Sequence, residues 1–225
     1  MDRVLTSRGL RAGRAQHRRD AESGHTLVEL TVAMTVFSIF LAMFIGAVVA
    51  VSRASTEARI DAQTSSAVGI ALQRIERSAR YADAINQPGA VGATAYVEWR
   101  TDAVSASTGV TTCTQLRYRA DDGTIALRSW PAAESPSTGE WSVVMRDVIG
   151  TATTTYPFAT IAAAAGVSNY QGLTVHLRAG LDDRAGSEAM TTMYAKNSSV
   201  ESPSNAVSAS GQSTTPICAG SGYRP

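Results

Sequence analysis

The sequence has few of the residue types from which catalytic and metal sites are built. Its 225 residues include two cysteines and three histidines, and the cysteines fit neither a CxxC spacing nor a Cys/His zinc pattern. GxSxG, HExxH, Walker and GxGxxG motifs do not occur. Asp121, Asp122, Asp182 and Asp183 have the neighbours typical of turns and lack EF-hand spacing. We therefore expect no enzyme, no metal site and no bound cofactor.

Lysine is almost missing, and so is a basic patch in the main part of the chain. Lys196 is the only lysine among 20 basic residues, and six arginines lie within residues 1–23. The remaining chain is slightly acidic, so it gives no sign of the basic surface typical of nucleic-acid binding. Contact with nucleic acid is left open as uncertain.

Charge is missing altogether from residues 30–52. These 23 residues follow Glu29 and end before Arg53. As a helix rising ~1.5 Å per residue, the run is ~35 Å long, enough to cross a hydrocarbon core of ~30 Å. Basic residues gather before the run. After the run, the basic Arg53 and Arg59 are offset by the acidic Glu57 and Asp61. The positive-inside rule therefore predicts a single-pass membrane protein with a cytoplasmic N-terminus and an extracytoplasmic C-terminal domain.

A cleaved secretory signal is an alternative interpretation of this stretch. The leader is basic, and Val48-Val49-Ala50 could pass as a small-residue cleavage site. Secretory signals carry ~7–15 apolar residues, however, whereas this run is longer and begins with a glutamate. We favour a helix that is retained. A carboxylate at membrane depth costs free energy, so Glu29 requires a compensating partner.

The helical pattern continues beyond the apolar run. Residues 53–84 contain no proline and one glycine. Apolar side chains recur every three or four residues, as in an amphipathic helix with one buried stripe. The members of this stripe are Val68, Leu72, Ile75, Ala79 and Ala82. The sequence Asn86-Gln87-Pro88-Gly89 is a stop signal. We expect one helix from Thr26 to about Ile85.

After this helix the pattern changes to short alternating segments separated by turns. The candidate strands are residues 91–100, 112–119, 124–130, 141–148, 156–161, 172–178 and 190–195. The turn Asp121-Asp122-Gly123 makes the hairpin between the second and third strands the best defined. Residues 197–216 are rich in Ser, Asn, Pro and Thr, which is typical of a mobile segment.

Gly24-His25-Thr26-Leu27-Val28-Glu29, followed by the apolar run, resembles the class III signal of type IV prepilins and pseudopilins. The resemblance implies that a prepilin peptidase cuts between Gly24 and His25 and methylates the new amino terminus of His25. It also implies an assembly role for Glu29, which would meet the N-terminal amine of a neighbouring subunit. His25 stands where phenylalanine is usual, which bears mainly on methylation.

Further segments are similar to the J-like and W-like minor pseudopilins. They are residues 72–85, 114–130, 141–150, 156–161 and 190–197. The resemblance implies an α+β, pilin-like fold in which a long N-terminal helix packs on a small antiparallel β-sheet. Gly46 is the only helix-weakening residue of the span, and the proline of many major pilins is absent, which favours a minor subunit. An unrelated small antiparallel sheet remains an alternative for the strand pattern.

These observations divide the chain into five parts. They are a basic leader removed by prepilin peptidase (1–24), a transmembrane and assembly half of the helix (25–52), an amphipathic half (53–87), an antiparallel β globular domain (88–196) and a flexible C-terminal tail (197–225). For an extracytoplasmic domain, a disulfide between Cys113 and Cys218 is favoured over two unpaired thiols. It could stabilise the domain by roughly 4–5 kcal/mol.

The function implied by the resemblance is structural. The chain would be a minor pilin or pseudopilin that initiates or caps a type IV pilus or a type II secretion or competence pseudopilus. Its expected partners are the prepilin peptidase, other pilin or pseudopilin subunits, the inner-membrane assembly platform and membrane lipid, and it would reach the cell surface after assembly. The alternatives are a membrane-tethered extracellular binding domain that does not polymerise and a tethered hydrolase. The lack of a base–nucleophile set disfavours the hydrolase.

Overall fold

The computed structural model describes residues 26–149, 157–181, 184–220 and 223–224. Two compact units divide the chain, Met1–Ser52 and Arg53–Pro225, and each is described by itself. The predicted leader, its Gly24–His25 junction and the first part of the predicted strand 156–161 lie outside the described residues.

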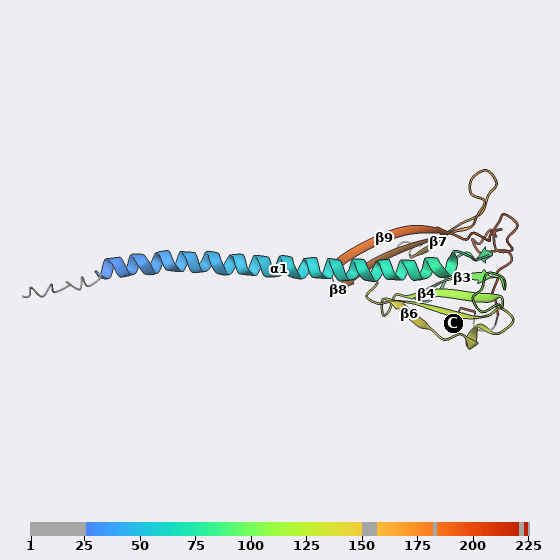
Figure 1. Ribbon diagram of the computed structural model, residues 1–225, viewed down its shortest axis with the longest axis horizontal. Helices are drawn as coiled ribbons and strands as arrows, with labels where there is room; N and C mark the ends of the chain where they lie inside the picture. The colour runs from blue at the N-terminus through green and yellow to red at the C-terminus, as the bar shows by residue number, and fades with distance from the viewer. Residues whose placement is uncertain (1–25, 150–156, 182–183, 221–222, 225) are drawn as a thin grey trace, which may run out of the picture. The chain divides into compact units, whose positions relative to one another are not determined.

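One helix, α1 (Leu27–Ala79), carries both the apolar run and the amphipathic stripe (Figure 1). The side chain of Thr26 caps its first turn, because the backbone N–H of Glu29 donates a hydrogen bond of 3.3 Å to Thr26 Oγ1. The helix ends at Ala79, earlier than predicted. Ala84 and Ile85 form strand β1 instead, because pairing with Arg100 and Trp99 satisfies their backbone groups within a sheet.

The strands of the described residues form two antiparallel sheets. The six-stranded sheet consists of β1 (Ala84–Ile85), β2 (Gly89–Val91), β3 (Thr94–Thr101), β4 (Thr112–Arg119), β5 (Thr124–Pro131) and β6 (Ser142–Met145). Its order is β1-β3-β4-β5-β6, and β2 also pairs with β3. A short 3₁₀ helix, η1 (Pro136–Thr138), lies between β5 and β6.

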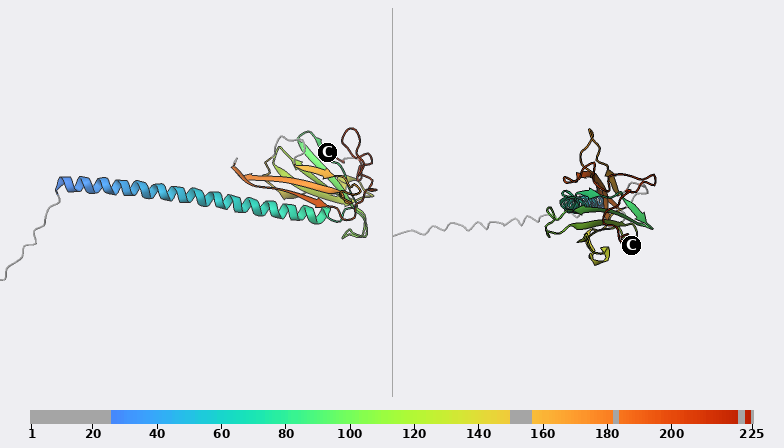
Figure 2. Two further views of the ribbon diagram at one scale, coloured as in Figure 1. Left: turned by 90° about the horizontal axis from the view of Figure 1, so that it is seen from above. Right: turned by 90° about the vertical axis from the view of Figure 1, so that its right-hand side faces the viewer.

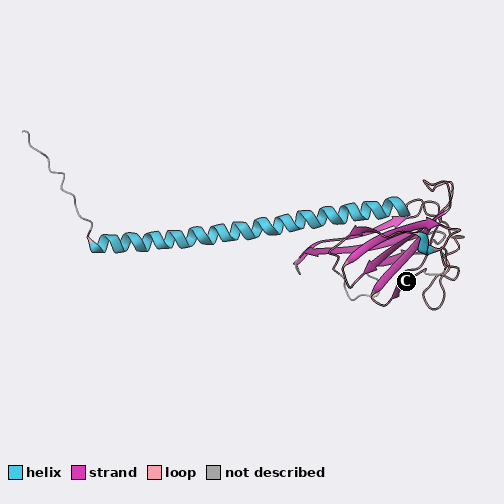
Figure 3. Cartoon of the chain, turned by 90° about the horizontal axis from the view of Figure 1, so that it is seen from below, coloured by secondary structure: helices cyan, strands magenta, loops and turns pink. Residues whose placement is uncertain are grey.

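The second sheet has three strands in the order β7-β8-β9. They are β7 (Phe158–Ile161), β8 (Gly172–Leu181) and β9 (Arg184–Tyr194). Figures 2 and 3 show the strands of both sheets gathered beside the C-terminal part of α1. The predicted α+β, pilin-like arrangement is thereby confirmed, with two sheets where a single small sheet was expected.

The helix and both sheets share one core. The buried apolar stripe of α1 consists of Val68, Ala71, Ile75 and Ala79. Its helical spacing agrees with the prediction, but Ala71 is buried where Leu72 was expected, and Leu72 is only partly buried beside the core. Trp99, Leu116, Leu173 and Val175, from both sheets, complete this core with no exposed surface. The β4–β5 hairpin has the predicted position, with Arg119 opposite Thr124 across the turn.

We call the second compact unit, Arg53–Pro225, the body of the protein. The chain after β9 contains no helix or strand among its described residues, yet it packs on the rest of the body. We call residues 197–220 and 223–224 the C-terminal strap. Ser198, Ser204 and Ile217 are buried, and Cys218 forms a disulfide with Cys113 of β4, with a Cα–Cα distance of 5.7 Å. This packing differs from the flexible tail that composition predicts, because side-chain hydrogen bonds take the place of an apolar core.

Candidate processing and assembly site

Glu29 lies in the first turn of α1, three residues after the capping Thr26. This is the spacing of a capping box, in which a glutamate at the third position supports the start of a helix. A carboxylate here also lies near the positive end of the helix dipole. The local chemistry therefore accommodates Glu29 at the start of the helix, immediately before a long uncharged segment.

The apolar side chains that follow Glu29 are exposed on every face of the helix. All described residues from 26 to 59 are exposed, and Phe37, Phe40 and Phe44 are each about two-thirds exposed. Within the described residues, α1 is long and apolar enough to cross a membrane, by length and composition. An apolar surface of this extent is typical of contact with lipid or with another protein.

The hydroxyl groups within this apolar segment are satisfied inside the helix. Thr31, Thr35 and Ser38 each donate a hydrogen bond of 2.8 Å to a backbone carbonyl three or four residues earlier. Such back-bonding lowers the cost of placing a hydroxyl in lipid, where water cannot serve as a partner. Sequence reasoning missed this detail, although Thr and Ser at helical positions are the signal for it.

A second glutamate, Glu98 in β3, is fully buried and was not recognised from the sequence. Gln115 Nε2 donates to its Oε1 at 2.8 Å, and Asn86 Nδ2 donates to its Oε2 at 3.2 Å. The flanking residues Val97 and Trp99 are buried too, so both faces of β3 are covered. A glutamate within a run of bulky β-formers was the available signal.

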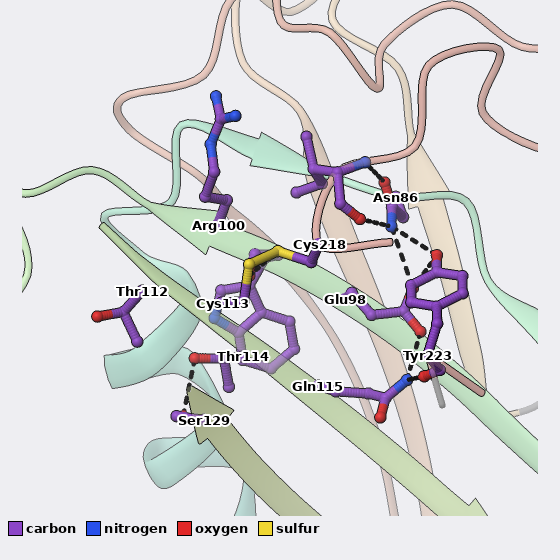
Figure 4. Close-up of a disulfide and its surroundings, with 12 residues drawn as sticks. Asn86, Glu98, Arg100, Thr112, Cys113, Thr114, Gln115, Ser129, Cys218 and Tyr223 are labelled. Atoms are coloured by element: carbon purple, nitrogen blue, oxygen red, sulfur yellow. Dashed lines mark hydrogen bonds between the residues drawn. A yellow bond between two sulfur atoms is a disulfide. The ribbon is translucent and has the colours of Figure 1, made fainter. Parts of the chain in front are cut away.

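The strap supplies the remaining donors to Glu98. Tyr223 OH donates to Oε2 at 2.8 Å, and Arg224 donates from Nε to Oε1 at 3.0 Å and from Nη2 to Oε2 at 2.8 Å. Figure 4 shows Glu98, Tyr223 and the nearby disulfide between Cys113 and Cys218. Five hydrogen bonds therefore compensate the burial of one carboxylate.

The electrostatics of the strap follow from this burial. Burial and the adjacent charge of Glu98 raise the pKa of Tyr223 above its ordinary value. Burial works against the charge of Arg224, but hydrogen bonds and attraction to Glu98 outweigh it, and its pKa is raised. Arg224 therefore stays cationic and Tyr223 stays neutral at physiological pH, which suits a structural anchor.

Comparison with protein families bears on the N-terminal site. Residues 19–45 match the family model described as the prokaryotic N-terminal methylation motif. The matched segment contains Gly24, His25 and Glu29 and extends into the apolar run. Comparisons with curated proteins and with solved structures find no match.

The motif implies processing by a prepilin peptidase and assembly with other pilins. Together with the apolar helix, it fits single-pass membrane anchoring. Pilin-type proteins are generally structural rather than enzymatic. The N-terminal methylation motif thus indicates a protein of the pilin and pseudopilin type.

Proposed function

We propose that this protein is a minor pilin or pseudopilin that initiates or caps a type IV pilus or a type II secretion or competence pseudopilus. One observation carries the proposal. Glu29 is the single charged residue of the helix from Leu27 to Ser52, and the apolar side chains around it are exposed on every face. A helix of this kind suits both residence in a membrane and packing against similar helices.

Processing explains the position of Glu29. A cut after Gly24 would create a cationic α-amine at His25, four residues before the carboxylate. In an assembly of parallel helices, the amine of one subunit would pair with Glu29 of the next. An ion pair in apolar surroundings is favourable only when both charges are present and well placed, so the pair would fix the axial register.

The proposed parts of the chain follow the same plan. Residues 1–24 would be the removed leader, and residues 25–52 the segment that lies first in the membrane and then in the filament. Residues 53–87 would join this segment to the β domain at 88–196, and the strap would close that domain. The N-terminus would lie in the cytoplasm before assembly, and the domain outside it.

The minor role is supported by two features of the described chain. The helix α1 continues through Gly46 without interruption and contains no proline. The body that follows carries two sheets and a disulfide-bound strap, which is more structure than assembly alone requires. We therefore place the chain at the start or tip of a filament, where a specialised body can act.

The decisive experiment follows processing and incorporation separately. We expect the full chain, produced with a prepilin peptidase and partner pilins, to lose residues 1–24 and to gain one methyl group, as measured by intact mass. Glu29→Ala should still be cut but should no longer enter sheared filaments. Glu57→Ala, which removes an exposed glutamate of the same helix beyond the apolar run, is the matched control.

Two results would contradict the proposal. A full-length membrane form that persists beside an active peptidase would remove the processing argument. Normal incorporation of the Glu29→Ala chain would exclude its assembly role. A processed chain that never co-purifies with or crosslinks to other pilins would instead favour the alternative, a membrane-tethered binding domain that does not polymerise.

A further inference from the structure

A cavity of about 460 Å³ lies between the end of α1 and the six-stranded sheet. From the helix it is lined by Arg74, Arg77 and Ser78, and from β4 and β5 by Thr114 and Ser129, among others. All of these residues belong to the body of the protein. The cavity thus brings the guanidinium groups of Arg74 and Arg77, which come from the helix, and several hydroxyl groups around one space.

The two arginines are only partly engaged. Arg74 donates from Nη2 to Ser142 Oγ at 2.9 Å and from Nη1 to the carbonyl of Val143 at 3.3 Å. These bonds use two of its five N–H groups and fix its side chain against strand β6. Arg77 is exposed, and among the described residues no hydrogen bond or ion pair engages its guanidinium.

Other arginines of the body do have carboxylate partners. They are Arg80, Arg100, Arg119 and Arg224, which pair with Glu76, Asp83, Asp122 and Glu98, respectively. Within the described chain, neither Arg74 nor Arg77 has an ion pair, although Glu140 also lines the cavity. Like charges three residues apart on a helix repel each other, so an anion placed between them would be favourable.

The walls of the cavity can add a neutral donor. Thr114 Oγ1 and Ser129 Oγ lie 3.0 Å apart and share one hydrogen bond (Figure 4). Because each hydroxyl carries one hydrogen, the pair keeps a hydrogen that can be donated elsewhere. Leu127 provides an apolar part of the lining, which lowers competition from water for any charged group that enters.

We propose that this cavity binds the carboxylate of an acidic peptide segment from a partner protein. Arg74, Arg77 and Arg128 line the cavity together with one anion, Glu140, so the lining is net cationic. Arg128 already donates hydrogen bonds to Gln115, Pro136 and Tyr223, which leaves Arg74 and Arg77 to receive a ligand. A net cationic lining attracts an anion, and Glu140 repels a doubly charged phosphate more strongly than a singly charged carboxylate. Planar guanidinium groups also fit the two oxygens of a carboxylate.

The test uses the full chain in detergent micelles, with the arginine Nε–H signals followed by NMR. The probes are a short peptide with one central glutamate, the same peptide with glutamine, and inorganic phosphate. We expect saturable shifts at Arg74 and Arg77 with the glutamate peptide. Affinity should fall about tenfold in Arg77→Gln, because one charge-assisted hydrogen bond is lost, and Arg77→Lys should recover only part of it.

Arg59→Gln is the matched control, because Arg59 is an exposed arginine of the same helix away from the cavity. It should bind the glutamate peptide like the unchanged chain. Arg77→Gln should unfold like the unchanged chain, because Arg77 has no partner among the described residues. Equal binding of the glutamine peptide, stronger binding of phosphate, or an equal loss in Arg59→Gln would each overturn the proposal.

Discussion

Two regions of this molecule differ in how burial relates to hydropathy: an apolar segment is exposed, and a polar segment is partly buried. The helical segment from Leu27 to Ser52 is the most apolar part of the chain, and every side chain in it is exposed. The C-terminal strap is rich in Ser, Asn and Thr, yet Ser204 and Ile217 are buried within it. The apolar segment is therefore suited to surroundings outside its own domain, such as lipid or other helices, whereas the strap is suited to packing on its own sheet.

Hydrogen bonds make the burial of the strap possible. Asn86 donates to the carbonyl of Ile217 and accepts from its N–H, both at 2.9 Å. Ser213 accepts a hydrogen bond of 2.9 Å from the N–H of Gln87 and donates one of 3.0 Å to the carbonyl of Ser204. A buried polar group that keeps its partners costs little, so a polar segment can pack as closely as an apolar one.

The largest expected effect comes from removing the charge that ends the strap. Arg224→Gln leaves Glu98, which has no exposed side-chain surface, without its cationic partner. Breaking one side of a buried pair costs about 3–5 kcal/mol. We expect that loss in the free energy of unfolding, measured by urea titration of the full chain in micelles with tryptophan fluorescence as the signal.

The double variant Glu98→Gln with Arg224→Gln distinguishes a buried pair from a general loss of packing. It should recover part of the stability, because the uncompensated charge is gone. Arg146→Gln, which removes an exposed arginine elsewhere in the body, should change little. A loss below about 1 kcal/mol in Arg224→Gln would show that the strap is as loosely held as its composition suggests.

The sequence was informative wherever a local pattern determined the structure. The apolar run, the buried stripe that ends at Ala79 and the β4–β5 hairpin all have a periodicity or a turn signal that needs no distant partner. The disulfide between Cys113 and Cys218 could be expected because only two cysteines were available. The prepilin-type motif at residues 19–45 is likewise a short local signal.

Features that depend on distant partners were not visible in the sequence. Ala84 and Ile85 continue a helical pattern but form β1, because β3 supplies backbone partners. β9 begins at Arg184, earlier than predicted, because pairing with β8 extends a segment that contains Gly186 and Ser187. The partners of Glu98 come from Asn86, Gln115 and the chain end, and no periodicity links these positions.

A smaller effect is expected from truncating one apolar side chain in each region of α1. Ile75 is fully buried and Phe40 is 68% exposed. Ile75→Ala should lower the free energy of unfolding of the body by about 2–5 kcal/mol, because it leaves a cavity in the core. Phe40→Ala should leave that quantity unchanged and should weaken partition of the full chain into vesicles instead.

Both variants remove a large apolar side chain from the same helix, so each serves as the control for the other. Tryptophan fluorescence reports on the body alone, because Trp99, Trp130 and Trp141 all lie there. Equal destabilisation by the two substitutions would contradict the conclusion that Ile75 stabilises the body and Phe40 does not. It would mean that Phe40 packs on the body in solution.

The smallest effect expected is a dependence on alkaline pH that arises in the strap. Burial raises the pKa of Tyr223 in the folded protein, whereas in the unfolded chain it ionises near pH 10. Its contribution to stability is therefore complete below about pH 10 and is lost as the pH rises toward the folded pKa. The slope reaches about 1.4 kcal/mol per pH unit, because the unfolded state then binds one proton fewer.

Tyr223→Phe should remove this part of the slope between about pH 10 and 11.5. Tyr118, whose pKa burial also raises, remains in both chains and cancels in the comparison. Tyr81→Phe, which changes an exposed tyrosine of the body, should keep the full slope. Urea titrations at several pH values measure it, and an unchanged slope in Tyr223→Phe would mean that the phenol does not stay neutral beside Glu98 when the protein is folded.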